Sequence, residues 1–466
     1  MAGPRGGKPV PVALTIAGSD SGGGAGIEAD LKVFAVLGVH GTAAVTSVTA
    51  QNTLGVTGVY DLPAEAVVRQ IEAVHSDLGV DAAKTGMLSN REIVEAVART
   101  VERLGFPLVV DPVMYAKSGD PLLRGDAVEA LARRLVPVAT VVTPNRMEAE
   151  RLSGIEIRGL DDARRAARFI VEELGAEAAV VKGGHLGGGE SVDILYYRGE
   201  YHTFRAPRIS GGCTHGTGCA FSAAIAAELA KGRSVPEAVA TAKRLVTLAI
   251  DYGLHLGGGH CPVNPVAWLA IPAETWRAVE SVEAAARLFE AESEALLPYA
   301  PEVGINIVQA LPAPYARGAS DVVGVEGRIV RVGARLRAVG PARPGASSHM
   351  ARLVLGLSRF YPAIRGAVNL AYRPSLVQAA LEMGLRVVRV DRSSEPPEVA
   401  GAEGRSMSWV AGEAARLSGA APPDVIYDEG APGKEAMARI VAGDALAAAE
   451  KALAIARRAR RLEGGV

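Results

Sequence analysis

The stretch from Ile209, ISGGCTHGTGCAFSAAIAAELAKG, places glycines directly before a run of good helix formers. The first N–H groups of a helix have no partner within it, and the helix dipole adds partial positive charge there. Glycines at this junction let backbone amides approach an anion without a Cβ in the way. We therefore predict that Gly216, Thr217 and Gly218 hold an oxyanion, best matched by a phosphoryl group in transfer. The alternative is a tight turn with no ligand.

Cys219 lies in the first turn of this predicted helix. A helix N-terminus lowers the pKa of a thiol, so Cys219 is predicted to act as a base or nucleophile, with a small buried cysteine as the alternative. A metal site is a third interpretation, and it would draw on Cys213, His215, Cys219, His260 and Cys261. The spacing CTHGTGC does not fit a zinc knuckle, which disfavours that interpretation. No GxxxxGK[ST] motif follows a strand, which excludes a P-loop.

A second glycine-rich stretch, AGSDSGGGAGIEADLKVF, follows the first apolar run and resembles a dinucleotide fingerprint only loosely. It is followed in the predicted helix by Asp30. In VTAQNT, Gln51 and Asn52 follow a β-branched run, where an amide can pair with the edge of a heterocycle. Each has a plain alternative: Asp30 as a solvated helix residue and Gln51 as a turn former.

These residues lie at the ends of alternating strands and helices. The segments VALTIAG (12–18), LVVDPVM (108–114), TVVTPN (140–145) and AAVVKGG (178–184) are apolar runs that end in turn formers or polar residues. They are typical of buried parallel strands. Helical patterns lie between them, at 63–78, 90–105 and 161–175. The alternation predicts a doubly wound α/β sheet that binds its ligands at the carboxyl edge of the strands.

The rest of the chain contains a helical bridge, predicted over residues 269–299, and a second domain over 300–462. The second domain mixes strands (GINIVQAL, GRIVRVG, GLRVVRVD, DVIYDEG) with helices (SHMARLVLGLSRF, PSLVQAALEMG, KEAMARIVAGDALAAAEKALAIARRAR). His349 opens an apolar helix after a serine N-cap, and Arg328 precedes a β-branched run. The turn from Gly430 to Gly433, before a helix expected near Lys434, is a further predicted anion-binding junction. The alternatives are a surface histidine, a salt-bridged arginine and a polar turn.

Length and composition limit the class of protein. A chain of 466 residues with 49% hydrophobic and 22% charged residues predicts a globular protein of two or more domains. A net charge of −1 gives no field that would attract nucleic acid or an acidic membrane. Three cysteines do not make a disulfide scaffold and suit a reducing compartment. Without a signal peptide or an apolar run of 18 residues in the sequence, we expect a cytoplasmic protein.

Seven motifs follow one another between residues 10 and 265: LTIAGSDSGGGAGIEADLK, VTAQNT, KTGML, DPVM..KSGDPLL, TPN..EAE, KGGH and THGTGCAFSAA. In this order they resemble the hydroxymethylpyrimidine/phosphomethylpyrimidine kinases of thiamine biosynthesis. The resemblance implies a ribokinase-like fold for residues 10–268, ATP as the phosphoryl donor, Mg²⁺ as cofactor and a homodimer formed through this domain. Another vitamin kinase of the same fold, such as a pyridoxal kinase, is the alternative.

The resemblance also implies roles for single residues. Cys219 falls on the family's proposed catalytic base, beside the anion hole of Gly216, Thr217 and Gly218. The implied substrate contacts are Gly18, Asp30 at the hydroxymethyl or phosphate side, Gln51 on the aminopyrimidine and Met87 on the ring. The implied nucleotide contacts are Lys182 and Asn145. The implied Mg²⁺ ligands are Asp111 and Glu148, whose oxygens suit a hard cation.

The segments GINIVQALP, GRIVRVG, SSHMARLVL, RGAVNLAY, VVRVDRS and DVIYDEGAPGKEAMARI resemble the archaeal-type thiamine-phosphate synthase domain. That resemblance implies the condensation of a pyrimidine diphosphate with a thiazole phosphate, with loss of pyrophosphate. It makes Arg328 and His349 the essential pair, in a site where cations matter more than a strong base. The competing interpretation is a sensor that binds thiamine phosphate without catalysis. Such relatives carry a helix-turn-helix unit, and this sequence contains none.

Overall fold

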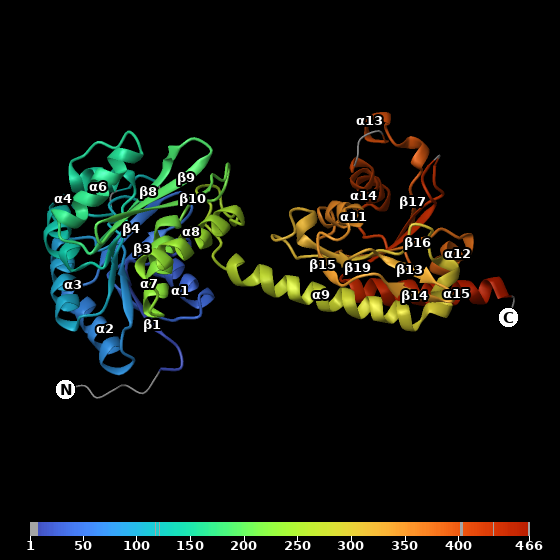
Figure 1. Ribbon diagram of the computed structural model, residues 1–466, viewed down its shortest axis with the longest axis horizontal. Helices are drawn as coiled ribbons and strands as arrows, with labels where there is room; N and C mark the ends of the chain where they lie inside the picture. The colour runs from blue at the N-terminus through green and yellow to red at the C-terminus, as the bar shows by residue number, and fades with distance from the viewer. Residues whose placement is uncertain (1–7, 117, 121, 401–403, 432, 465–466) are drawn as a thin grey trace. The chain divides into compact units, whose positions relative to one another are not determined.

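The computed structural model describes residues 8–116, 118–120, 122–400, 404–431 and 433–464. The chain divides between Leu269 and Ala270 into two compact units (Figure 1). Each unit has hydrophobic cores of its own. None of the helices within the described ranges is long and apolar enough to cross a membrane.

An eight-stranded sheet forms the centre of the first unit, in the order β10-β9-β8-β7-β6-β5-β1-β2. Its strands are β1 (Val12–Ala17), β2 (His40–Val45), β5 (Ala82–Thr85), β6 (Leu108–Val110), β7 (Val141–Val142), β8 (Ala178–Gly187), β9 (Glu190–Tyr197) and β10 (Glu200–Pro207). All pairings from β2 to β8 are parallel, and β9 and β10 add antiparallel strands at one edge. The predicted doubly wound α/β fold is confirmed.

Helices cover both faces of this sheet, which explains why its central strands are apolar throughout. One face carries α2 (Ala64–Asp77), α3 (Arg91–Leu104), α4 (Gly125–Ala130), α5 (Arg146–Ser153) and α6 (Leu160–Glu172). The other carries α1 (Gly26–Val36), α7 (Thr217–Ala230) and α8 (Val235–Asp251) (Figure 1). The alanines of α7 are almost all buried, because this helix packs between the sheet, α1 and α8. Its start at Thr217 is where the sequence predicts it.

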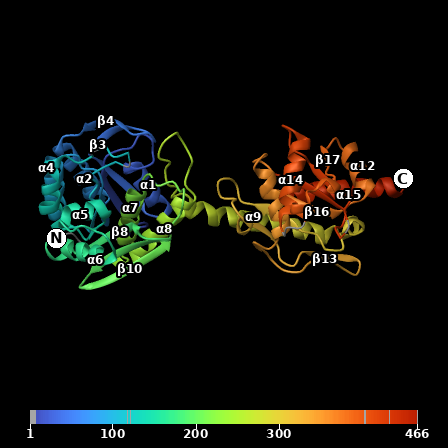
Figure 2. The same cartoon turned by 90° about the horizontal axis from the view of Figure 1, so that it is seen from above.

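A separate antiparallel hairpin, β3 (Ser47–Gln51) and β4 (Val56–Asp61), leaves the sheet after β2. It carries the VTAQNT motif. Within the first unit it lies on the opposite side from the β9–β10 hairpin (Figure 2). Several of its side chains are exposed, including Val48, Val59 and Tyr60. The hairpin thus projects from the sheet and carries Gln51 at its tip.

The second unit has a seven-stranded, mostly antiparallel sheet, in the order β15-β12-β11-β16-β19-β18-β17. Its strands are β11 (Ile307–Ala310), β12 (Val322–Val325), β15 (Ala342–Pro344), β16 (Gly366–Ala371), β17 (Val387–Arg389), β18 (Val425–Asp428) and β19 (Met437–Ala442), with a small hairpin of β13 (Ile329–Val332) and β14 (Arg335–Ala338). Helices α11 (Ser348–Ser358) and α14 (Arg405–Ser418) cover one face, and α9 (Ala267–Ala291), α10 (Ser293–Leu296), α12 (Pro374–Glu382) and α15 (Ala445–Gly464) the other (Figure 1). The short helix α13 (Pro397–Ala400) precedes α14.

The bridge predicted over residues 269–299 is part of this second unit. Phe289, Leu296 and Tyr299 have no exposed surface and pack in the same core as α15 and the sheet. The bridge is therefore an amphipathic helix with a buried face and is not a free spacer.

One long helix predicted from Lys434 is wrong. Residues 437–442 form β19, and the helix α15 begins only at Ala445. Side chains of β19 alternate between two cores, with Ala438 and Ile440 on one side and Val441 on the other. That period-2 burial overrides the helix propensity of the alanines. No helix starts at Lys434, so the predicted anion-binding junction there is withdrawn; residue 432 of that turn lies outside the described residues.

Candidate functional site

The first candidate site lies where α7 begins. Its N-cap residue, Gly216, has φ of 85°, a left-handed conformation that glycine adopts readily. A Cβ on Gly216 would lie 1.9 Å from the carbonyl oxygen of Gly24. The absence of a side chain therefore lets the loop after β1 press against the start of α7. This contact brings the two glycine-rich stretches of the sequence together.

The amino end of α7 faces a partly buried ion pair. A Cβ on Gly218 would lie 3.3 Å from Oδ2 of Asp111 and 3.6 Å from Nζ of Lys182. Lys182 Nζ is itself 3.2 Å from Asp111 Oδ1. Burial would lower the pKa of Lys182, but the charges of Asp111 and Glu148 raise it. An anion beside Gly218 would meet a lysine that stays protonated and a helix N-terminus.

The predicted nucleotide and metal residues meet at the carboxyl ends of β6, β7 and β8. Glu148 and Asn145 form the capping box of α5: Glu148 Oε2 accepts a bond from Asn145 N (2.8 Å), and Asn145 Oδ1 accepts one from Glu148 N (3.0 Å). Burial raises the pKa of Glu148 to about 7, because the attraction of Lys182 offsets it only in part and Asp111 adds repulsion. Two carboxyl groups thus share this corner with one lysine.

Cys219 is the one cysteine of the three outside a disulfide, and it is partly exposed at this same corner. The predicted low pKa is wrong. Burial raises the pKa of Cys219 to about 11, and the nearby Lys84 charge and the Gly26 amide offset this only in part. The position in the first turn of α7 is as predicted, but desolvation of the thiolate outweighs the helix dipole.

Asp30 lies in the interior of the first unit, within electrostatic reach of Cys219. Its carboxylate is fully buried, and Oδ2 accepts bonds from Thr15 Oγ1 (2.6 Å) and Lys84 Nζ (2.9 Å). Lys84 is equally buried. Burial would lower the pKa of Lys84, but Asp30, Cys219 and Asp111 together raise it to about 12. Asp30 thus neutralises Lys84 behind Cys219 through Oδ2, while its Oδ1 has no hydrogen-bond partner among the described residues, so its contact with the substrate stays a prediction.

Replacing Asp30 by alanine tests this structural role. It would leave the Lys84 charge buried without its partner, so we expect the free energy of unfolding of the first unit to fall by about 3–5 kcal/mol. Urea denaturation measures it. Glu65→Ala is the control, because Glu65 pairs with Arg69 on the surface of α2 and is expected to cost less than about 1 kcal/mol. Equal losses of unfolding free energy in the two variants would contradict the structural role of Asp30 as the partner of Lys84.

The predicted pyrimidine contacts gather around the loop after β1. A Cβ on Gly18 would lie 3.2 Å from Sδ of Met87, so these two residues touch. Ser21 Oγ accepts a bond from Gln51 N (2.8 Å), and it donates one to Gln51 O (2.7 Å). The loop thus joins the sheet, Met87 and the tip of the β3–β4 hairpin. Gln51 is partly exposed.

Asp20 is a residue that the sequence patterns did not single out. Its carboxylate accepts bonds from the amides of Gly22 (2.8 Å), Gly24 (3.1 Å) and Ala25 (2.8 Å), and it lies 2.9 Å from His215 Nε2. Burial opposes ionisation, but these bonds, led by that of His215, lower the pKa of Asp20. Its place directly after β1, before three glycines, is the signal that could have revealed it.

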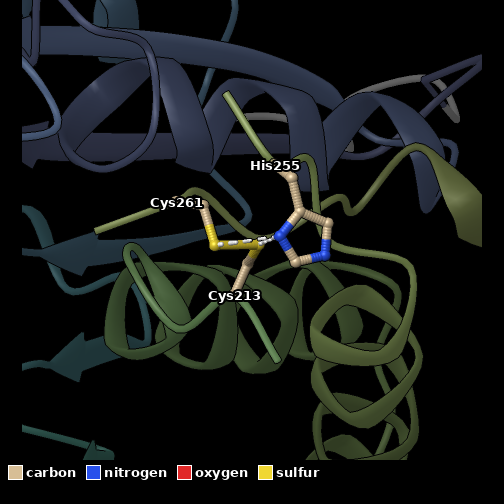
Figure 3. A group of neighbouring side chains, drawn as sticks. All are labelled: Cys213, His255 and Cys261. Atoms are coloured by element: carbon tan, nitrogen blue, oxygen red, sulfur yellow. Dashed lines mark hydrogen bonds between the residues drawn. A yellow bond between two sulfur atoms is a disulfide. The ribbon is translucent and has the colours of Figure 1, made fainter. Parts of the chain in front are cut away.

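The sulfur and imidazole groups do not form the metal set considered from the sequence. Cys213 and Cys261 form a disulfide, and Nδ1 of His255 lies 3.7 Å and 3.9 Å from their sulfurs (Figure 3). His215 instead pairs with Asp20, and Cys219 is separate from this group. The cluster is close to the anion junction, because Cys213 stands three residues before Gly216.

The second unit places four arginines within electrostatic reach of His349. His349 lies in the first turn of α11 and is open to solvent. Partial burial lowers its pKa, and the charges of Arg439, Arg352, Arg328 and Arg392 lower it further. These arginines come from β19, α11, the turn before β13 and the 3₁₀ turn Arg392–Ser394. The lowered pKa disfavours the imidazolium form of His349, so the four arginines supply the positive field around it.

Only part of this charge is neutralised by the protein. Arg439 Nη1 is 2.6 Å from Asp428 Oδ2, and Arg392 Nη2 is 3.1 Å from Glu395 Oε2. Lys434 Nζ shares Glu395, at 2.8 Å. Nη1 of the buried Arg392 has no hydrogen-bond partner among the described residues. This donor can therefore bind an acceptor that enters the site, such as an oxygen of an anion.

Comparisons with known proteins agree with both resemblances. The family described as phosphomethylpyrimidine kinase matches residues 20–264, and the family described as thiamine-phosphate synthase ThiN matches residues 281–454. A hydroxymethylpyrimidine/phosphomethylpyrimidine kinase from Streptomyces coelicolor is 52% identical over 254 residues, which are 54% of this chain and 94% of that protein. The thiamine biosynthesis bifunctional protein ThiED from Geobacter sulfurreducens is 50% identical over 254 residues, 54% of this chain and 52% of that protein.

Solved structures confirm the ribokinase-like fold of the first unit. The ADP complex of Bacillus subtilis pyridoxal kinase covers 55% of this chain and 98% of that chain, with 40% identity and a TM-score of 0.52. A Staphylococcus aureus pyridoxal kinase in complex with AMP-PCP and pyridoxal covers 56% of this chain and 95% of that chain, with 36% identity and a TM-score of 0.52.

Proposed function

Because the chain belongs to the phosphomethylpyrimidine kinase family through residues 20–264, we propose that its first unit phosphorylates 4-amino-5-hydroxymethyl-2-methylpyrimidine and then the resulting monophosphate, with ATP as donor. The observation that carries the proposal is the opening of α7 onto Lys182 and Asp111, beside Cys219. Phosphoryl transfer needs positioning and charge stabilisation more than covalent chemistry, and this corner supplies both. Gly216, Thr217 and Gly218 would receive the transferring group, Lys182 the nucleotide phosphates, and Asn145 the nucleotide beside it.

Asp111 and Glu148 are the residues that would hold Mg²⁺. Their carboxyl groups are close enough for the Asp111 charge to raise the pKa of Glu148. A bound cation would offset this repulsion between the two acids. Lys182 neutralises only one of the two. A bound Mg²⁺ would neutralise charge on the phosphates of ATP. Glu148 would remain anchored by its bond to the amide of Asn145.

The kinase proposal is tested by incubating the full chain with ATP, Mg²⁺ and the aminopyrimidine alcohol, and separating the products by chromatography. Successive appearance of the monophosphate and the diphosphate supports it. Pyridoxal is the competing substrate, because these structural relatives are named pyridoxal kinases. A higher kcat/KM for pyridoxal would reassign the first unit. Gel filtration tests the accompanying proposal of a homodimer formed through this unit.

Gln51→Leu tests the pyrimidine site. Loss of an amide that pairs with the aminopyrimidine should raise the KM for the pyrimidine by about tenfold, with kcat changed by less than about threefold. The KM for ATP is the internal control, since the nucleotide residues lie on other elements. An unchanged KM for the pyrimidine would remove Gln51 from the site.

For the second unit we propose the condensation that follows: the thiazole nitrogen bonds to the methylene carbon of the pyrimidine diphosphate, while the bond from that carbon to the diphosphate oxygen breaks. Pyrophosphate leaves with the bonding electrons, and thiamine phosphate remains. The cationic cluster around His349 supports this proposal, because it can stabilise the charge that develops on the leaving diphosphate. The two units would then act in sequence, since the first makes the diphosphate that the second consumes.

The test supplies the full chain with synthetic pyrimidine diphosphate and thiazole phosphate, and measures pyrophosphate release. ATP is left out, so that failure of the kinase cannot mask the result. Binding of thiamine phosphate without any pyrophosphate release would favour a sensor in place of an enzyme.

A further inference from the structure

The disulfide between Cys213 and Cys261 closes a loop of the chain at a sequence separation of 48 residues. Cys213 is fully buried, and Cys261 is partly exposed in the loop after α8. The proposed mechanism uses neither sulfur. The disulfide therefore calls for an explanation of its own.

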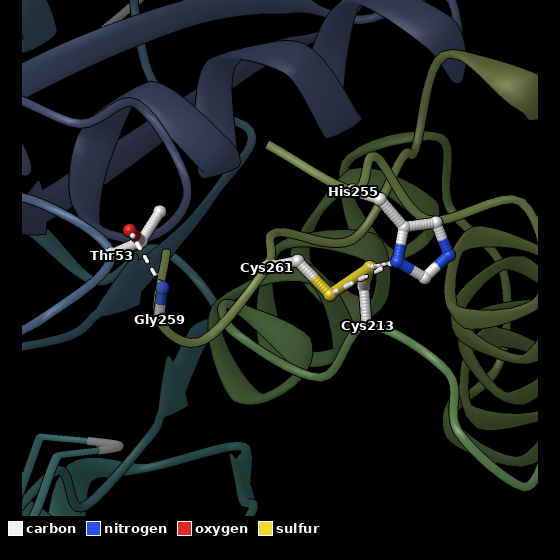
Figure 4. Close-up of a disulfide and its surroundings, with 5 residues drawn as sticks. All are labelled: Thr53, Cys213, His255, Gly259 and Cys261. Atoms are coloured by element: carbon white, nitrogen blue, oxygen red, sulfur yellow. Dashed lines mark hydrogen bonds between the residues drawn. A yellow bond between two sulfur atoms is a disulfide. The ribbon is translucent and has the colours of Figure 1, made fainter. Parts of the chain in front are cut away.

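The loop that carries Cys261 is packed against the segment that follows Gln51. Thr53 O accepts a bond from His260 N (2.8 Å), and Thr53 Oγ1 accepts one from Gly259 N at 3.3 Å (Figure 4). A Cβ on Gly259 would lie 2.1 Å from Thr53 O, and one on Gly257 would lie 2.3 Å from Thr53 Oγ1. Two glycines are thus needed for this close approach. The loop supports the tip of the β3–β4 hairpin two residues beyond Gln51.

The same loop is joined to the anion junction. Cys261 O accepts a bond from His215 N (3.2 Å), and His215 O accepts one from Val263 N (3.0 Å). His215 in turn contacts Asp20, whose carboxylate orders the loop after β1. The disulfide lies at this meeting point. Breaking it would remove the covalent cross-link and leave hydrogen bonds and packing to hold the loop against both the pyrimidine and the phosphoryl sides of the site.

The surroundings of the sulfurs also allow the bond to be exchanged. Solvent reaches Cys261, so a small thiol can attack there. Nδ1 of the exposed His255 is within 3.9 Å of both sulfurs (Figure 3). In the reduced protein this imidazole can accept a thiol proton, which generates the thiolate that re-forms a disulfide. A structural disulfide would need neither an open sulfur nor a base beside it.

We propose that Cys213 and Cys261 form a thiol–disulfide switch that controls the affinity of the kinase site for its pyrimidine, an inference that rests on the proposed kinase function. A dithiol supplies two electrons and two protons: the Cys213–Cys261 bond breaks, each sulfur ends as a thiol, and the dithiol becomes a disulfide. The released loop holds Thr53 less firmly, so the tip of the hairpin loosens and Gln51 keeps only its two backbone bonds to Ser21. A low-molecular-weight disulfide reverses the reaction by thiol–disulfide exchange.

The test compares the oxidised and the dithiothreitol-reduced full chain. Isothermal titration with the aminopyrimidine alcohol, without nucleotide, should show a Kd about tenfold higher after reduction, because a loop that is no longer preorganised must be ordered on binding. EDTA is present, since two thiolates and an imidazole would also bind Zn²⁺. Hydrogen exchange should rise in residues 254–261 on reduction. Cys261→Ser is the matched control and should bind weakly with or without dithiothreitol.

Equal Kd values for the oxidised and reduced wild-type protein would overturn the switch, even if hydrogen exchange changed. Binding by Cys261→Ser that is as tight as binding by the oxidised protein would overturn it as well. If neither state binds the pyrimidine, the proposed substrate is wrong, and the titration is repeated with pyridoxal. The Kd values of the oxidised and the reduced protein for pyridoxal then test the switch: a higher Kd after reduction supports it, and equal Kd values overturn it.

Discussion

Cys219→Ala is expected to lower kcat for both phosphorylations by about 10²-fold or more, the usual effect of losing a general base. Cys219 lies in the first turn of α7, directly after the amides of Gly216, Thr217 and Gly218. In the proposed kinase reaction Cys219 would take the proton of the attacking hydroxyl while these amides hold the phosphoryl group. Single-turnover kinetics measure the effect, once with the aminopyrimidine alcohol and once with its monophosphate as the substrate. A loss of less than about threefold in both steps would reject the role.

The raised pKa gives this prediction a characteristic pH dependence. With a pKa of about 11, Cys219 is almost entirely a neutral thiol at pH 7. The thiolate fraction, and with it kcat/KM, should rise by about tenfold per pH unit between pH 7 and 9 if the thiolate is the base. Cys219→Ala, which lacks the sulfur, should not show this rise of kcat/KM with pH. A wild-type profile that is flat from pH 7 to 9 would show that another group takes the proton.

Arg328→Gln is expected to lower kcat/KM for thiamine phosphate formation by about 10²-fold, the effect of removing one donor from a site that stabilises developing charge. Arg328 is exposed, and its guanidinium donates to Val303 O while its charge reaches His349. Its φ of 71° is a property of the turn before β13, and glutamine keeps a long side chain there. The loss should therefore reflect charge more than folding.

Pyrophosphate release from synthetic pyrimidine diphosphate measures the effect of Arg328→Gln. Kinase turnover in the same preparation should be unchanged, because the kinase residues belong to the other unit. Arg335→Gln, an exposed arginine of β14, is the matched control and should retain the synthase rate. Similar losses in both variants would point to a general effect of surface charge and not to a role for Arg328.

Local patterns determined much of the first unit. Apolar runs ending in Gly, Pro or Asn predicted β1, β6, β7 and β8, because strands covered on both faces must be apolar throughout. The glycine-to-helix junction at Gly216 was equally visible, since the constraint is one of backbone conformation and acts within a few residues. The second unit was harder to predict. In β19, alanine and isoleucine suit either a helix or a strand, and only the two cores that the strand separates decide between them.

The chemistry of the sites depended on contacts between distant segments, which no local pattern encodes. Asp30 became the buried partner of Lys84, 54 residues away, and Cys213 met Cys261 across 48. The pKa of Cys219 was set by its desolvation at the start of α7, which reversed the shift expected from the helix dipole. Sequence thus identified the reactive groups by their type and their place at element ends. Tertiary packing alone determined which of them face solvent, which are neutralised, and which carry an unpaired charge toward a ligand.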